Sequence, residues 1–277
     1  ETWTFENEIL PPPKCTSVAA RNIELQINRN ILNHELINDD RVVPSYYTIN
    51  WDIKMLLFDM KIEQEHAKDS SGMDLGHRFI HPISDLKEDI HLLKPTTFSV
   101  DKEKTIKWKD FVEEILGDIL PVRLEVDLPG ACLSQDIVHL MGMETMMYSL
   151  IDYPDEFHQI MSRITKDYID FYKWLEKEGL LTLNNGSNFV RQGSFGYTRD
   201  LPGKDYDFQK YVTTHDMWGY MDSQETVSIS PEMYGEFFFP YYAEVAKNFG
   251  LLSYGCCEPV DSIWDKYLSK LANLRKI

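Results

Sequence analysis

Two adjacent cysteines followed by a glutamate form the most reactive group of residues in the sequence. Cys256, Cys257 and Glu258 directly follow the apolar run 251–254. Thiolates bind zinc, and a bound zinc ion activates a thiol or an ether as a Lewis acid. Neighbouring side chains diverge on an extended backbone, however, and the two-residue spacing of structural zinc sites is absent. The alternative is that Cys256 is a small buried side chain at a strand end and Cys257 a loop residue.

Polar residues also follow two other apolar runs. Asn184 and Asn185 follow the run 180–183 and lead to Arg191 and Tyr197. Turn chemistry explains Gly186, but it explains the repeated asparagines ahead of an arginine less well, so this loop is a candidate for ligand contact.

The stretch 215–224 mixes aromatic side chains with carboxyl and amide groups, namely Asp216, Trp218, Tyr220, Asp222 and Gln224. Asp222 and Gln224 alternate with apolar positions, as residues lining a barrel would. The alternative is that the aromatic residues pack in a core and that Asp216 caps a turn. Together with Tyr254, these stretches predict a pocket lined by Asn184, Asn185, Arg191, Tyr197, Trp218, Tyr220, Gln224 and Tyr254.

The elements that must position these residues alternate between strands and helices. A helix is predicted from Pro154 to a stop at Gly179, and another from Ser230, with a break near Phe237 caused by Pro240. Further helices are expected over 17–38 and 107–116 and from Asp261. Strands are expected over 41–51, 119–126, 180–183, within 217–228, over 251–254, and from 273 as the onset of a sixth.

This order predicts a parallel α/β sheet with its ligand site at the carboxyl ends of the strands. A closed (β/α)8 barrel needs eight strands, so we expect a TIM-barrel-like fold that lacks its first and last strands. We predict a single barrel domain over residues 1–277, with a long irregular excursion around 53–104.

Charge and composition exclude several classes of protein. The chain has 28 Lys and Arg residues against 45 Asp and Glu residues, a formal net charge of −17. This charge disfavours a nucleic-acid partner, since such binding requires cations that neutralise phosphates. No apolar run approaches the length of a membrane span, and the four cysteines predict reduced thiols in a cytoplasmic protein. The hydrolase, dinucleotide and phosphate-loop motifs are absent.

The run from Ser228 to Asp261, SISPEMYGEFFFPYYAEVAKNFGLLSYGCCEPVD, resembles the uroporphyrinogen decarboxylase superfamily. In that superfamily an SPEMF-like helix start and a Pro-Tyr interruption precede the strand that ends in the active-site cysteine. The blocks DMWGYMDSQ and LLTLNNG are similar to earlier strands of the same family.

The resemblance implies one of two activities, or none. In the methyltransferase branch, zinc at Cys256 with Cys257 or Glu258 would assist methyl transfer from a small substrate to a corrinoid on a partner protein. That branch binds zinc through a His-x-Cys strand end, and Tyr254 stands here where the family has histidine.

The second activity is decarboxylation of a porphyrinogen, with Asp216 or Asp222 stabilising a pyrrolinium. The arginine-rich segment of the decarboxylases is absent. The third possibility is a non-catalytic barrel that binds a small ligand. We expect Asp216, Asp222 and Glu258 as catalytic residues and a homodimer as a possible assembly.

Overall fold

The chain is divided into two compact units. The computed structural model describes residues 8–37, 41–70, 72, 74–191, 194–204, 206–207 and 209–277. Contacts define unit 1 as Glu1–Ile49 with Lys102–Leu124, and unit 2 as Asn50–Asp101 with Glu125–Ile277. The prediction of one barrel domain over 1–277 stays a prediction, because a division into compact units does not by itself set a domain boundary.

The described part of unit 1 contains two α-helices and most of a two-stranded sheet. Helix α2 (Val18–Leu36) begins at Ser17, whose hydroxyl accepts from the backbone N–H of Ala20. Helix α4 (Lys102–Leu116) begins five residues before the expected start. The strands are β1 (Tyr47–Asn50) and β6 (Val122–Glu125), each shorter than predicted. The core of this unit consists of Ile23, Tyr47, Ile49, Val112 and Leu116.

Unit 2 contains the predicted parallel sheet. Its strands are β7 (Gly130–Ala131), β8 (Trp218–Met221), β9 (Leu251–Tyr254) and β10 (Leu274–Lys276), in the order β10-β9-β8-β7 with all neighbours parallel. The strands expected near 217, 251 and 274 are therefore confirmed, and the fold is mixed α/β. The expected strand 180–183 is wrong: Leu180 and Leu181 are buried, but the segment forms no backbone ladder.

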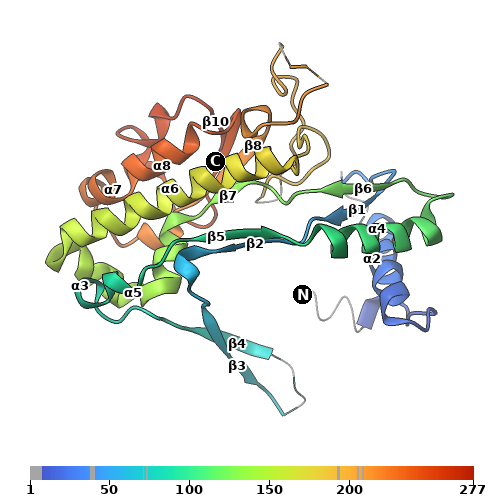
Figure 1. Cartoon of the computed structure of the whole chain (residues 1–277), viewed down its shortest axis with the longest axis horizontal. Coiled ribbons are helices and arrows are strands. Elements are labelled where there is room, and N and C mark those ends of the chain that lie inside the picture. Colours follow the sequence, from blue (N-terminus) through green and yellow to red (C-terminus); the bar gives the residue numbers. More distant parts are fainter. Residues whose placement is uncertain are drawn as a thin grey trace. The chain divides into compact units, whose positions relative to one another are not determined.

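Helices connect the four strands of this parallel sheet, as parallel pairing requires. They are α5 (Leu133–Asp152), α6 (Pro154–Glu178), α7 (Pro231–Phe237), α8 (Phe239–Ala246) and α9 (Asp261–Trp264). Figure 1 shows α6 as the long yellow helix of this unit. Gly179 ends α6 with a φ of 66°, and the chain breaks between α7 and α8 at Phe238, as the position of Pro240 predicts. Among the described helices, none combines the length and apolar character needed to cross a bilayer.

The region 53–104, expected to be irregular, contains two pairs of antiparallel strands. Strand β2 (Ile53–Leu56) pairs with β5 (Thr97–Val100), and β3 (Glu63–Lys68) pairs with β4 (Asp74–Ile80). The short helix α3 (Leu86–Asp89) follows β4. All residues of β3 and all but Phe79 of β4 are exposed. Because neither face of this hairpin is buried, the sequence carries no apolar alternation by which to recognise it.

Candidate functional site

The carboxyl ends of three parallel strands bring some of the candidate residues together. Met221, the last residue of β8, pairs with Tyr254 of β9 and with Ala131 of β7. Cys132, Asp222 and the segment 255–258 therefore leave the sheet at one edge. This edge is where an α/β sheet places its ligands.

Asp222 is a buried carboxyl group at this edge. It is 5% exposed, and its Oδ2 accepts a hydrogen bond of 2.7 Å from the Tyr220 hydroxyl. Burial raises the pKa of Asp222, and the charges of Glu258 and Glu225 act in the same direction. Its Oδ1 is buried and has no hydrogen-bond partner within the described ranges. An unpaired buried oxygen is less costly on a neutral acid than on a carboxylate, which acts in the same direction as burial. Hydrogen bonds from the Tyr220 hydroxyl and the Cys132 thiol act in the opposite direction and lower the pKa of Asp222 in part.

Cys256 and Cys257 are exposed at the same edge, and their sulfurs lie 3.5 Å apart. Glu258 fixes the loop that carries them: its Oε2 accepts from the backbone N–H of Cys256 at 2.9 Å and of Cys257 at 3.1 Å. Its Oε1 accepts from the N–H of Ser223 at 2.9 Å. Glu258 thus joins the loop after β9 to the loop after β8.

These residues do not fit a zinc ion by themselves. A catalytic zinc site uses three protein ligands, and both oxygens of Glu258 already accept backbone hydrogen bonds. In the part of the chain that the structure describes, no group of three or more His, Cys, Asp or Glu side chains is arranged to hold a metal. The two thiols would therefore supply only two of the three protein ligands that a catalytic zinc site uses.

Tyr254 lies on the opposite face of the sheet from Tyr220. Its hydroxyl lies 2.5 Å from the Ser223 hydroxyl and 3.1 Å from that of Tyr234, within the core formed with α7 and α8. Tyr220 and Tyr254 belong to different faces because they differ by one residue in register, Met221 being the residue paired with Tyr254. A ligand contact by Tyr254 stays a prediction.

Asp216, Trp218 and Asn184 lie toward the amino end of β8, away from Asp222. Asp216 caps a short 3-10 helix, where its carboxylate accepts from the backbone and side chain of Thr213. The Asn184 side chain accepts from the N–H of Trp218 at 2.8 Å and donates to its carbonyl at 3.0 Å. Strand β7 pairs only with the last two residues of β8. The Asn184 side chain therefore supplies the hydrogen bonds that a neighbouring strand would make to Trp218.

The structure therefore does not bring all residues of the predicted pocket together at one end of the sheet. The Trp218 indole donates to the Gly196 carbonyl and is 1% exposed, and Asn185 donates to the Leu201 carbonyl. The Trp218 bond binds the loop after residue 183 to the sheet, and the Asn185 bond closes that loop on itself. The structure gives Asp216, Asn184, Asn185 and Trp218 positioning contacts, and their roles in catalysis or ligand binding stay predictions.

Three further candidates lie in loops or at helix starts. The Arg191 guanidinium lies 5.7 Å from the centre of the Tyr220 ring, and Arg191 has a φ of 71°. Gln224 begins the 3-10 helix η5 (Gln224–Thr226), and the Tyr197 side chain is 56% exposed. Arg191 is thus a cation close to the Tyr220–Asp222 pair.

The start of α5 supplies polar residues that the sequence reasoning missed. The Ser134 hydroxyl donates to Glu225 at 2.7 Å, and the Tyr168 hydroxyl donates to Asp136 at 2.7 Å. Burial raises the pKa of Asp136 to about 7. Strand β7 has only two residues and leaves no periodic signal, although the Ser and Asp that follow Cys132 are typical of a helix start.

The fold and this edge define a mixed α/β protein with an acidic, thiol-bearing site at the carboxyl ends of parallel strands. No protein-family model matches the chain, and no curated protein sequence matches it. Among solved structures, a methyltransferase from Methanosarcina mazei is similar with a TM-score of 0.40 and 14% identity. The match covers 92% of this chain and 61% of that one, so the chain spans less than two thirds of that protein's length.

Proposed function

We propose that this chain takes part in methyl transfer from a small methylated substrate, with Asp222 as the acid. The supporting observation is a buried carboxyl group with a raised pKa at the strand edge that also carries Cys256 and Cys257. The sequence resemblance of residues 228–261 to the methyltransferase branch of the uroporphyrinogen decarboxylase superfamily selects this reaction among those that an acid can assist.

Asp222 would supply the proton that the leaving group needs. When a bond between a methyl carbon and oxygen breaks, its electron pair stays on oxygen, and the methyl group bonds to the electron pair of the acceptor. Proton transfer from Asp222 to that oxygen lets methanol lose water instead of hydroxide, and an aryl methyl ether lose a phenol instead of phenoxide. A positioned acid contributes about 10²–10⁴-fold to such a step. The Tyr220 hydroxyl, bound to Oδ2, would fix the orientation of the carboxyl group.

Two predictions from the sequence are also part of this proposal: the methyl acceptor and the type of barrel. We propose a corrinoid on a partner protein as the methyl acceptor, and we propose that β7 to β10 belong to a (β/α)8-type barrel. Zinc assistance, a homodimer and a cytoplasmic location remain predictions from the sequence. The role given to Asp222 depends on none of them.

A panel of methyl donors tests the proposal. The chain is incubated without oxygen with cob(I)alamin and methanol, an aryl methyl ether or tetramethylammonium, and methylcobalamin is followed by its absorbance. We expect Asp222→Asn to slow transfer from the two oxygen donors about 10²-fold or more. Transfer from tetramethylammonium, whose amine leaves without a proton, should change little.

Two cysteine variants control for the position of the site. The predicted zinc assistance at Cys256 has its own test: Cys256→Ser should lower every transfer rate if zinc assists and leave the rates unchanged if it does not, whereas Cys15→Ser, a thiol of unit 1, should not lower them. Absence of methylcobalamin with all donors, from chain whose circular dichroism shows it to be folded, would overturn the proposal. Release of CO₂ from a porphyrinogen acid would point instead to the decarboxylase alternative.

A further inference from the structure

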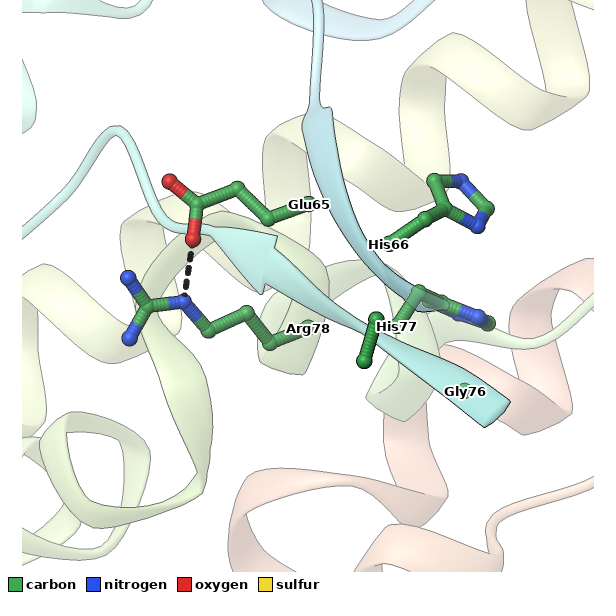
Figure 2. Close-up of a pocket in the computed structure, with 6 residues that line it drawn as sticks. Glu65, His66, Gly76, His77 and Arg78 are labelled. Atoms are coloured by element: carbon green, nitrogen blue, oxygen red, sulfur yellow. Dashed lines mark hydrogen bonds and ion pairs between the residues drawn. The ribbon is translucent and has the colours of Figure 1, made fainter. Parts of the chain in front are cut away.

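The β3–β4 hairpin carries two imidazoles side by side on one of its faces. His66 of β3 is directly opposite His77 of β4, and the ring centres lie 5.5 Å apart with the planes inclined by 37°. Figure 2 shows both rings on one side of the hairpin and the Glu65–Arg78 pair on the other. These residues, with Ala67 and Gly76, line an open cavity of about 460 Å³.

The separation of the rings matches that of two imidazoles on one metal ion. A Zn–N bond is about 2.0 Å long, which puts the ion about 3.2 Å from the centre of each ring. Two rings in tetrahedral positions around that ion would then have centres about 5.2 Å apart. The observed 5.5 Å is close to this value without movement of the backbone.

Asp74 lies beside one of the rings. Its Oδ2 lies 3.5 Å from Nδ1 of His66, which leaves Nε2 as the nitrogen available to a ligand. A carboxylate beside the far nitrogen of a metal-binding histidine is the usual second partner in such sites. On the opposite face, Arg78 pairs with Glu65 at 2.6 Å.

The base of the hairpin is fixed while its paired strands are exposed. Phe79 stacks on His139 of α5 with ring centres 4.1 Å apart, and Nδ1 of His81 lies 2.9 Å from the His139 carbonyl. The two-stranded segment beyond this base has almost no buried side chain, and such a ribbon is marginally stable in water. A ligand that joins β3 to β4 would therefore stabilise it.

We propose that His66 and His77 bind a divalent transition-metal ion across the hairpin. Two neutral imidazoles suit Zn²⁺, Ni²⁺ and Cu²⁺, with Cu²⁺ bound most tightly, and water occupies the remaining positions. This inference is independent of the methyl-transfer proposal, because it uses none of the residues at the strand edge.

Hydrogen exchange of the hairpin amides with Zn²⁺ as the probe tests this site. The experiment uses the whole chain carrying Cys256→Ser and Cys257→Ser, so that the thiol pair does not compete for zinc. At a Zn²⁺ concentration ten times the Kd, exchange in 63–68 and 74–80 should slow about tenfold. His66→Gln and His77→Gln should each abolish this protection, whereas His91→Gln, a change at another exposed histidine, should keep it.

A histidine substitution could open the hairpin even without metal. A spectroscopic measurement on the chain with both histidines therefore tests the site independently. In the same cysteine-free background, one equivalent of Cu²⁺ should give an electron paramagnetic resonance spectrum with two coordinated imidazole nitrogens. Unchanged exchange with Zn²⁺, or a spectrum with fewer than two nitrogens, would overturn the inference.

Discussion

At the scale of single residues, the carboxyl groups differ in what surrounds them. Asp216 and Asp222 are both acidic residues of one short stretch, yet Asp216 caps a turn and Asp222 is buried beside Tyr220. Asp136, which no pattern in the sequence marks as reactive, has its pKa raised by burial to about 7. Burial is therefore the largest cause of the raised pKa of Asp136 and of Asp222.

The raised pKa of Asp136 predicts how stability depends on pH. An unfolded Asp has a pKa of about 3.9, so between about pH 4 and 7 the folded state binds more protons than the unfolded state. The contribution of Asp136 is most favourable below the unfolded pKa and is lost as the pH rises through about 7. Asp136→Asn keeps an oxygen for the Tyr168 hydroxyl but removes the ionisation.

Urea unfolding at pH 4 and at pH 7 measures this effect. We expect the fall in unfolding free energy between the two values to be smaller in Asp136→Asn, by about 3 kcal/mol. Asp110→Asn, at an exposed position of α4, should match the unsubstituted chain. Equal pH dependence in Asp136→Asn and the unsubstituted chain would show that Asp136 ionises normally.

At the scale of elements, boundaries marked by local chemistry were predicted well. Pro154, Gly179 and Pro240 mark the start of α6, its end and the break before α8, because each acts on its own backbone. The segment 180–183 was predicted wrongly as a strand, since a strand exists only where a neighbour supplies its ladder. Beside it, a side chain, Asn184, bonds to the backbone of β8 instead.

Gly179 gives a direct test of the end of α6. Its φ is 66°, and an added Cβ would lie 3.0 Å from the Tyr211 ring. Gly179→Ala should therefore lower the unfolding free energy by about 1 kcal/mol, measured by urea denaturation. Gly203→Ala is the matched control, because a Cβ there meets no atom within 4 Å. An equal change in both variants would contradict the assigned cause.

At the scale of the whole molecule, each unit has its own apolar core. The core of unit 1 is centred on Val112, which is fully buried, and it shares no buried residue with the larger core of unit 2. Removing volume from one core should therefore loosen that unit first.

Val112→Ala tests this separation by hydrogen exchange. Amides of α2, α4, β1 and β6 should exchange about 5–30-fold faster, which corresponds to about 1–2 kcal/mol. Amides of α6 and β8 should not change. Val18→Ala, at a position of α2 that is 74% exposed, is the matched control. An equal acceleration in α6 and β8 would show that the chain opens as one cooperative unit.

The sequence by itself determined the mixed α/β class, most helix ends, three of the parallel strands and the thiol-bearing loop after β9. These features depend on short-range chemistry: capping, the fixed φ of proline and continuous apolar runs. Only the tertiary structure decided which candidates meet. Sheet register placed Asp222, Cys256 and Glu258 at one edge and left Asp216 at the other end of β8, and the pleat turned Tyr254 away from Tyr220. The sequence also did not predict the hairpin with His66 and His77, because exposed strands carry no burial pattern and their pairing is a contact between distant residues.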